Sequence, residues 1–180
     1  MEPEDFVNIL YLKSGNADQV AAYETLSRYR IFELLSAFDP LLAGTVPIGL
    51  NIEGSDLDVL CYVRDDAIFI ELLNFSFSQF PGFQMRQTNI NGRHCVVASF
   101  YADSWAIEIF GQDVPSELQD GFRHLLIEAK ILEEQDTLFR QELIRLKRTG
   151  YKTEPAFFSL LGLEGDPYVA LLDYGRRFGI

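Results

Sequence analysis

The sequence predicts an α+β fold with an α/β-like core, in which a mixed β-sheet is flanked by helices and covered by a C-terminal helical layer. Three observations predict it. Two apolar extended runs, residues 56–63 and 104–111, are separated by a helical stretch. The dipeptide Asn91-Gly92 is the strongest short signal for a hairpin and adds an antiparallel part. From Pro115 onward the apolar residues recur at helical spacing.

The N-terminal part of the chain is predicted to contain two helices and a short strand. Residues 3–13 and 18–38 carry apolar residues near helical spacing. Pro40 ends the second helix, because proline lacks the amide hydrogen that a helix interior needs. Residues 41–45, "LLAGT", then form a short apolar run that ends in a glycine turn, which indicates a first strand.

The middle of the chain is predicted to form a helix between strands. Asp65 and Asp66 are well placed to start a helix, and residues 67–80 are apolar almost all round, which predicts a buried helix. Strands on both sides of Asn91-Gly92 follow, and residues 104–111 form a further strand.

The C-terminal part is predicted to be entirely helical. Residues 116–135 and 136–150 form two helices, and residues 153–175 form two short ones, each with a proline close to its start. We therefore divide the chain into residues 1–114, an α/β core with N-terminal helices, and residues 115–180, a helical region packed on that core.

Charge and composition restrict the class of partner. The 180 residues include 27 acidic and 15 basic ones, so the formal net charge is −12. Phosphate binding depends on Lys and Arg, so this charge disfavours long nucleic acid as a partner. A small molecule or a protein is the expected partner.

Cysteine usage and hydropathy predict a cytoplasmic protein. Cys61 and Cys95 lie inside apolar runs and are interpreted as small core residues in a reducing compartment, rather than as a disulfide or a metal pair. The N-terminal residues are acidic, whereas a secretory signal is positively charged. No apolar run approaches the ~20 residues that cross a bilayer, so no membrane association is expected.

Three carboxylates predict a metal site. Residues two apart on a strand point to the same face, so Asp56 and Asp58 project together at the start of an apolar run. Two adjacent carboxylates repel unless a cation lies between them, and oxygen ligands suit Mg²⁺ or Mn²⁺ better than Zn²⁺. Glu108 interrupts another apolar strand and needs a partner there, which makes it the third candidate ligand.

The glycine-rich loop before Asp56 predicts a phosphate site. Gly44 and Thr45 follow a strand, so they can turn backbone N–H groups and one hydroxyl toward a phosphate. Gly49 and Gly54 let the loop fold back close to such a ligand. The spacing matches neither the Walker loop, which needs a lysine, nor the dinucleotide fingerprint.

These residues resemble the signature of the DNA polymerase beta-like nucleotidyltransferase superfamily. That signature is a Gly-Ser or Gly-Gly turn, a loop of about ten residues and an aspartate pair separated by one apolar residue. Thr45 departs from the usual serine but keeps the hydroxyl, and Gly49 and Ser55 fall where small members carry glycine and serine. The stretches "IEIFGQ", "RHLLIEAKIL" and "KTEPAF" are similar to a bacterial nucleotidyltransferase-fold family of unknown function. This resemblance covers nearly the full length.

The resemblance implies a nucleotidyltransferase fold and a Mg²⁺- or Mn²⁺-dependent transfer of a nucleoside monophosphate from a nucleoside triphosphate, such as ATP, to a small-molecule or protein hydroxyl. Asp56, Asp58 and Glu108 would then be the metal ligands and catalytic residues. Contacts to the nucleotide would come from Gly44, Thr45, Gly49, Ser55, Arg123, Lys130 and Lys152. The acceptor, the base preference and the oligomeric state are not implied.

Other interpretations stay open. The same fold can act as a catalytically weak or inactive nucleotide-binding module, for example as one half of a toxin-antitoxin pair. The acidic turn can also belong to a purely structural protein. A single helix histidine such as His124 is more often structural than catalytic, and His94 beside the hairpin turn is a weaker candidate. The basic residues near the end of the 136–150 helix are more often a solvated face; they are Arg145, Lys147, Arg148 and Lys152.

Overall fold

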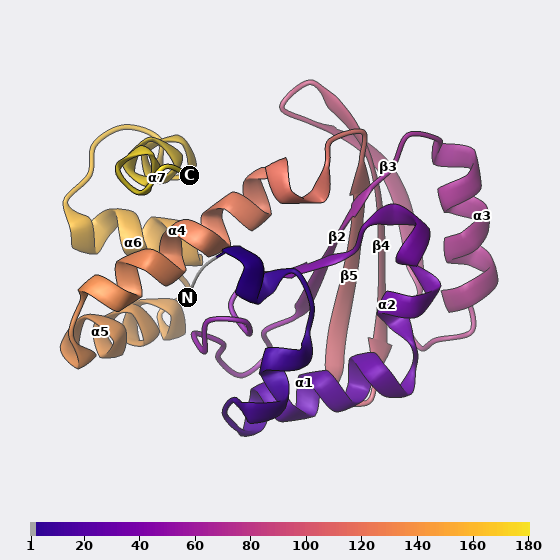
Figure 1. The fold of residues 1–180 in the computed structure, drawn as a ribbon, viewed down its shortest axis with the longest axis horizontal. Helices are drawn as coiled ribbons and strands as arrows, with labels where there is room; N and C mark the ends of the chain where they lie inside the picture. Colours follow the sequence, from indigo (N-terminus) through magenta and orange to yellow (C-terminus); the bar gives the residue numbers. More distant parts are fainter. Residues whose placement is uncertain (1–2) are drawn as a thin grey trace.

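The structure is a computed structural model that describes residues 3–180 and forms one five-stranded sheet with helices at both ends of the chain (Figure 1). The prediction for the first domain begins at residue 1, so its first two residues lie outside the described part. The strands are β1 (Leu41–Ala43), β2 (Leu57–Tyr62), β3 (Gln84–Ile90), β4 (Arg93–Ala102) and β5 (Trp105–Gln112). The helices are α1 (Ala17–Arg28), α2 (Ile31–Leu34), α3 (Asp66–Phe77), α4 (Asp120–Glu134), α5 (Thr137–Arg148), α6 (Thr153–Leu161) and α7 (Pro167–Gly175).

The sheet is mixed, as predicted. Its strand order is β1-β2-β5-β4-β3. The central pair β2 and β5 is parallel, whereas the other neighbours are antiparallel. The β3–β4 hairpin turns at Asn91 and Gly92, which both adopt the positive φ that this kind of turn requires.

One face of the sheet packs against α1, α2 and α3. Alternate strand residues point to this face, among them Val59 on β2, Ile109 on β5 and Ala98 on β4, and all three are fully buried there. Phe77 of α3 stacks on Phe100 of β4 with ring centroids 5.0 Å apart. This packing makes the main core and fixes which strand residues point to the opposite face.

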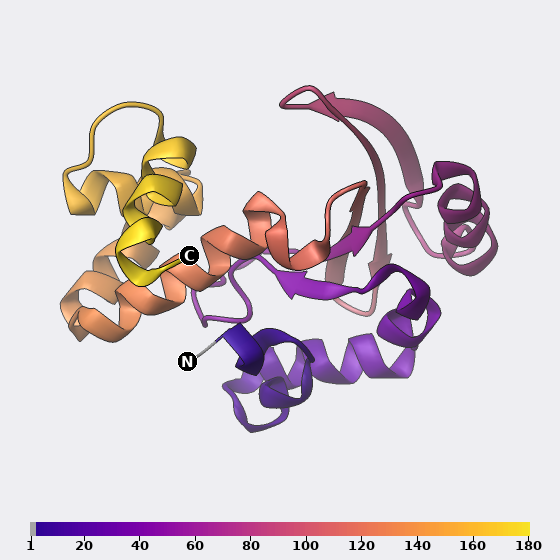
Figure 2. The same ribbon diagram turned by 45° about the horizontal axis from the view of Figure 1, so that its top comes forward.

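The opposite face carries the helical layer, but only at one end of the sheet. Leu41 and Ala43 of β1 and Leu60 of β2 pack against buried residues of α4, such as Phe122 and Leu125, and this second core continues through α5, α6 and α7. Figure 2 shows α4–α7 gathered at one side of the sheet and the β3–β4 hairpin at the other, with its tip curving back toward them. Within residues 3–180, no residue of β3 or β4 belongs to this second core, and on β5 Phe110 packs against it.

The predicted N-terminal helices form differently from the prediction. Residues 3–13 contain two 3₁₀ turns, Pro3–Phe6 and Leu10–Ser14, instead of one α-helix. The predicted helix over 18–38 breaks at Arg30, which is left-handed with φ 54° and so cannot continue a right-handed helix. The apolar spacing is kept because the shorter pieces bury the same side.

The helix α3 is also less buried than its composition indicates. It was predicted to be buried all round, but Phe75 is 85% exposed and Ile68 is 60% exposed. The helix lies at the outside of the molecule and contacts the sheet with one face only (Figure 1). The helix α3 therefore carries more apolar residues than its one packed face buries, and the prediction of a helix buried on all sides was wrong.

Two predictions on composition can be compared with the structure. Cys61 and Cys95 are both free and buried, in agreement with their interpretation as core residues. Within residues 3–180, no helix combines the length and the apolar character needed to cross a bilayer.

Candidate functional site

A cleft of about 1040 Å³ opens between the sheet and the helical layer. One wall consists of β1, the loop that follows it, β2 and β5, and the hairpin of β3 and β4 extends this wall. The other wall consists of α4, the end of α5, and the starts of α6 and α7. The carboxylates and the glycine turn predicted from the sequence lie on the sheet wall.

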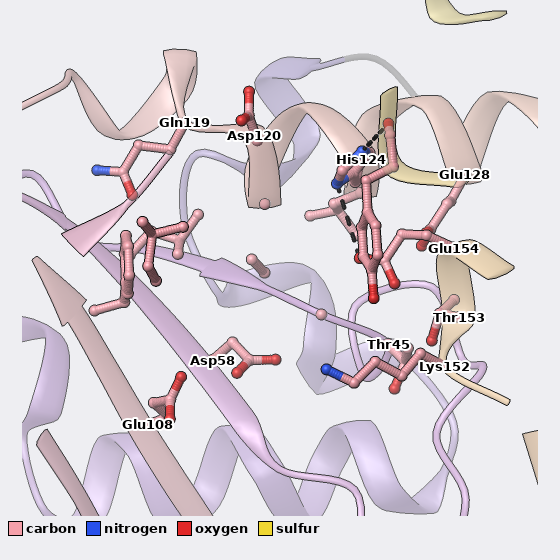
Figure 3. A pocket seen from close by; sticks show the side chains of 18 of the residues that line it. Thr45, Asp58, Glu108, Gln119, Asp120, His124, Glu128, Lys152, Thr153 and Glu154 are labelled. Atoms are coloured by element: carbon pink, nitrogen blue, oxygen red, sulfur yellow. Dashed lines mark hydrogen bonds and ion pairs between the residues drawn. The ribbon is translucent and has the colours of Figure 1, made fainter. Parts of the chain in front are cut away.

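The strand register aligns the central groups in one row. Ala43 of β1 pairs with Asp58 of β2, and Asp58 pairs with Glu108 of β5. Side chains of paired residues point to the same face of a sheet, so both carboxylates face the cleft. Figure 3 shows Asp58 between Glu108 on one side and Thr45 on the other. The Gly44 turn directly after β1, Asp58 on β2 and Glu108 on β5 thus lie side by side across the sheet.

Gly44 lies directly against the Asp58 side chain. Its φ of 75° is in the left-handed region, and a Cβ atom placed there would collide with the Asp58 carboxylate oxygen Oδ2. Glycine is therefore required twice, by its backbone conformation and by the close approach of the carboxylate. This turn brings the backbone after β1 next to the predicted metal ligand.

We expect Gly44→Ala to lower both stability and nucleotide binding. Left-handed strain costs about 1–2 kcal/mol, and the added methyl displaces Asp58. Gly54→Ala is the matched control, because Gly54 has φ 83° but a Cβ atom there meets nothing within 4 Å. Thermal unfolding and Mg-nucleotide titration of both variants separate the effect of backbone strain from the effect of the collision with Asp58. Equal losses in the two variants would contradict a specific role of the Gly44–Asp58 approach.

The loop between β1 and β2 is held by side chains from distant helices. Gln19 of α1 donates to the carbonyl oxygens of Val46 and Pro47 at 3.0 and 2.9 Å. Arg140 of α5 donates to the carbonyl oxygen of Ile48 at 2.9 Å, and Lys147 of the same helix donates to that of Leu50 at 2.8 Å. These bonds satisfy loop carbonyls that no strand pairs and fix the loop in place.

Burial and neighbouring carboxylates raise the pKa of Asp58 to about 7. Burial is the larger cause, and the charges of Asp56, Glu108 and Glu154 add to it, while Lys147 acts in the opposite direction. A cation that joins several like-charged carboxyls favours the ionised form of each of them. The electrostatics of this row therefore fit a divalent ion.

The carboxylates are adjacent but do not yet converge. In the described part of the chain, no three His, Cys, Asp or Glu side chains come together closely enough to hold an ion. The Oε2 atom of Glu108 instead pairs with a guanidinium nitrogen of Arg86 at 3.3 Å. Like charges repel, so drawing Asp56, Asp58 and Glu108 together needs a cation. The oxygen-only ligand set still suits Mg²⁺ or Mn²⁺.

The helical wall carries a second group of ionisable side chains. His124 of α4 donates from Nε2 to the carbonyl oxygen of Tyr168 at 3.0 Å, and its Nδ1 lies 3.8 Å from Oε1 of Glu154. Glu128, one turn further along α4, is only 3% exposed, and burial followed by the charge of Glu154 raises its pKa well above the usual value. Among the described residues, no donor forms a hydrogen bond or ion pair with its carboxyl. We call His124, Glu128, Glu154 and Tyr168 the annex.

Lys147 connects the annex with Asp56, Asp58 and Glu108, which we call the carboxylate row. It lines the cleft, is 7% exposed, and interacts electrostatically with Glu128, Glu154, Asp56 and Asp58. Burial lowers its pKa, and these carboxylates partly offset that effect. An ammonium that lines the same cleft as the Gly44 turn is a group that can bind phosphate.

The cleft brings together most of the residues predicted for it. Its lining includes Gly44, Thr45, Ser55, Asp56, Asp58, Glu108 and Lys152. Three of the predicted nucleotide contacts lie elsewhere. Gly49 forms a turn held by Arg140, Arg123 lies in a separate groove beside Asp120, and Lys130 pairs with Glu133. Helix rotation accounts for the last two, because Leu125 and Glu128, not Arg123 and Lys130, take the cleft-facing positions of α4.

Four residues of the cleft were missed or misjudged from the sequence. Lys147 was grouped with a solvated basic face, but it is buried. Glu128, Arg86 and Arg93 were not considered. The position of Lys147 seven residues after Arg140 places both on one face of α5, and this spacing is the one signal that pointed to a shared role. No comparable signal existed for the hairpin arginines, whose placement depends on tertiary structure.

The fold agrees with that of nucleotidyltransferases. A crystal structure of the Cid1 poly(U) polymerase with MgGTP bound matches with a TM-score of 0.50 at 14% identity, over 72% of this chain and 40% of that chain. The structure of the GLD-2/RNP-8 complex matches with a TM-score of 0.51 at 10% identity, over 87% of this chain and 61% of that chain. The likeness shows a nucleotidyltransferase fold, and this chain spans less than two thirds of either structure.

The chain belongs to the family described as a domain of unknown function, DUF4269, whose sequence pattern matches residues 24–174. A comparison with curated proteins finds no match. The family range includes every residue of the carboxylate row and the annex.

Proposed function

We propose that the protein is a metal-dependent nucleotidyltransferase that moves a nucleoside monophosphate from a nucleoside triphosphate to a hydroxyl group. The observation that carries this proposal is the row formed by Gly44, Asp58 and Glu108 on three adjacent strands at the mouth of the cleft. The nucleotidyltransferase fold supports it, and so does the group of carboxylates around Asp58, whose charges add to burial in raising the pKa of Asp58.

Each part of the row has a role in this reaction. Asp56, Asp58 and Glu108 would hold Mg²⁺ or Mn²⁺, which supplies charge neutralisation of the triphosphate and lowers the pKa of the attacking hydroxyl. Backbone N–H groups at Gly44 and the hydroxyls of Thr45 and Ser55 would contact the outer phosphates, since all three residues line the cleft. Lys147 and Lys152 would add positive charge to the phosphate site.

The chemistry is an in-line displacement at the α-phosphorus. The hydroxyl oxygen of the acceptor forms a new bond to that phosphorus, while the bond between the α-phosphorus and the oxygen that bridges it to the β-phosphorus breaks. Pyrophosphate leaves with the electron pair, and the hydroxyl proton passes to water.

Label transfer tests the proposal. Protein incubated with Mg²⁺, a cell lysate and α-labelled ATP, GTP, CTP or UTP is expected to produce a labelled acceptor and to release pyrophosphate. In the double variant Asp56→Asn/Asp58→Asn, we expect the rate to fall by more than about 100-fold. Asp113→Asn is the matched control, because Asp113 is an exposed aspartate that does not line the cleft. Undiminished labelling by the double variant would contradict the proposed metal site.

One observation favours a second function, a nucleotide-binding module of low or no activity. Glu108 is paired with Arg86, and within the described residues the three carboxylates do not form a group that could hold an ion. Calorimetry with Mg-nucleotide distinguishes the two functions. Binding without turnover across a broad set of acceptors supports the module, and a lack of binding by any nucleotide contradicts both.

A further inference from the structure

We propose that the part of the cleft formed by β3, β4 and β5 is the acceptor subsite, and that Arg86 and Arg93 there bind an oxyanion on a small hydroxyl compound. The oxyanion is a phosphate or a carboxylate. This inference rests on the proposed function, because it identifies the chemical class of the acceptor for the same cleft.

The order of Gly44, Asp58 and Glu108 across the sheet indicates where the leaving pyrophosphate and the acceptor lie. In an in-line displacement, the attacking oxygen and the leaving pyrophosphate lie on opposite sides of the phosphorus. The glycine turn at Gly44 and Thr45 is on the β1 side of Asp58, and Glu108 is on the β5 side. If the outer phosphates lie at the turn, the acceptor hydroxyl approaches from Glu108 and the rest of the acceptor extends over β5, β4 and β3.

That side of the cleft offers a suitable surface. The α4–α7 layer packs on β1, on β2 and on Phe110 of β5, and within residues 3–180 no residue of β3 or β4 belongs to its core. Phe110 and Gln112 of β5 and Ile90 at the tip of the hairpin line the cleft. Phe110 is half-buried and Ile90 is 45% exposed, so a ligand there meets apolar surface next to polar groups.

Negative charge is in excess on the helical wall of the cleft, and positive charge is in excess on the side formed by β3, β4 and β5. On the helical wall, four carboxylates, those of Asp120, Glu128, Glu154 and Asp166, outnumber two ammonium groups, those of Lys147 and Lys152. On the strands β3, β4 and β5, the charged lining residues are Arg86, Arg93 and Glu108. Glu108 is assigned to the metal site, so the two guanidiniums form a positive region in a protein of net charge −12.

Both guanidiniums have donors available for a ligand. Arg86 makes one hydrogen bond, from Nη2 to Glu108, out of the five that a guanidinium can donate. Arg93 has no ion pair with any carboxylate of residues 3–180, and it sits opposite Ile90 in the hairpin register. Guanidinium groups bind phosphate and carboxylate through two parallel hydrogen bonds, which gives geometric selectivity for oxyanions.

The same observations favour a small acceptor over RNA. Binding of a nucleic acid strand depends on several cations that follow its backbone. The hairpin offers two cations at its end of the cleft, and the whole chain carries 27 acidic residues against 15 basic ones. Two guanidiniums are enough to bind one oxyanion near the reactive hydroxyl.

Nuclear magnetic resonance of the arginine Nε–Hε groups tests the inference without turnover. The probes are glycerol 3-phosphate, glycerate, glycerol and 3-aminopropane-1,2-diol, which share the hydroxyl groups and differ in charge. We expect the phosphate or the carboxylate compound to shift the Arg86 and Arg93 resonances in a saturable manner, and the neutral and cationic compounds to leave them unchanged. The difference between glycerol 3-phosphate and glycerate identifies the oxyanion.

Variants provide the controls. Arg93→Gln is expected to weaken binding of the anionic probe about tenfold, since it removes a charge-assisted pair of hydrogen bonds. Arg145→Gln is the matched control, because Arg145 is an exposed arginine of α5 that pairs with Glu142 and does not line the cleft. Absence of any shift, or equal shifts at Arg145, would overturn the inference. A tighter, strongly salt-dependent response to oligo(U) RNA would also overturn it in favour of RNA.

Nucleotide titrations separate this inference from the proposed function. Binding of a non-hydrolysable Mg-nucleotide is expected to be the same in Arg93→Gln and in the unchanged protein. If Arg93→Gln weakens nucleotide binding, the arginine holds the triphosphate and the acceptor assignment is wrong, while the transferase proposal stands. If the anionic probes bind but no nucleotide does, the proposed function fails and the arginines form an oxyanion site of another kind.

Discussion

Asp58→Asn is expected to eliminate nucleotidyl transfer and at the same time to stabilise the folded protein at neutral and higher pH. The carboxylate of Asp58 is surrounded by Asp56, Glu108 and Glu154, and burial and these charges raise its pKa to about 7. An amide of the same shape removes the repulsion but cannot serve as an anionic metal ligand. Stability and activity therefore move in opposite directions.

The dependence on pH follows from the direction of the pKa shift. Asp58 has a pKa of about 7 in the folded protein, against the ordinary aspartate pKa of 3.8 that applies to the unfolded chain. The folded state holds its proton more tightly, so the stability from this group is fully present below pH ~4 and is lost as the pH rises to about 7. Relative to Asp58→Asn, the unchanged protein loses on the order of 2 kcal/mol across this interval.

Thermal unfolding between pH 4 and 8 measures this effect. The difference in free energy of unfolding between the two proteins is expected to grow with pH, whereas Asp113→Asn follows the unchanged protein throughout. Addition of Mg²⁺ is expected to raise the Tm of the unchanged protein at pH 7 and above, but not that of Asp58→Asn. A destabilised Asp58→Asn variant, or equal stabilisation of both proteins by Mg²⁺, would contradict the assignment of Asp58 as a metal ligand.

The parts of the fold that depend on local patterns were predictable from the sequence. Asn91-Gly92 gave the hairpin because both residues tolerate positive φ, and the apolar runs gave β2 and β5 within about a residue of each end. The break at Arg30 was not predictable, because it places a residue without special turn preference in a left-handed conformation. Tertiary packing determines such a break, and no local residue signals it.

The candidate site likewise contains residues that the local sequence predicted and residues that only tertiary structure places there. Gly44, Asp56 and Asp58 lie within a short stretch, so their spacing alone placed them together, and Glu108 was found because a carboxylate in an apolar strand needs a partner. Arg123 and Lys130 were chosen by charge, but the rotation of α4 gives its cleft-facing positions to other residues. Lys147 is 97 residues from the carbonyl of Leu50 that it contacts, and this distance in sequence hid its role.

Lys147→Met is expected to cause the largest loss of stability among single changes in the cleft. The side chain is 7% exposed, and its ammonium donates to the carbonyl oxygen of Leu50 at 2.8 Å. Methionine fills a similar volume but leaves this carbonyl without its partner and the nearby carboxylates of Glu128 and Glu154 without their cation. Removal of one member of a buried charged group costs about 3–5 kcal/mol.

Lys152→Met is the matched control for this change. Lys152 also lines the cleft but makes no hydrogen bond to the loop between β1 and β2 within residues 3–180, so its loss is expected to leave the Tm nearly unchanged. Denaturant unfolding gives the free energies of both variants, and hydrogen exchange of the Leu50 and Asn51 amides reports on the loop. In Lys147→Met we expect faster exchange there together with weaker binding of Mg-nucleotide.

The charge and the hydrogen bond of Lys147 can be separated by a second change. In Lys147→Met/Glu128→Gln, the buried carboxyl that has lost its cation is neutral at every pH, so part of the lost stability is expected to return above pH 7. The exchange rates at Leu50 are expected to stay high, because the carbonyl still lacks its donor. If the double variant is no more stable than Lys147→Met, the ammonium acts on the loop alone, and the electrostatic link between the annex and the carboxylate row is wrong.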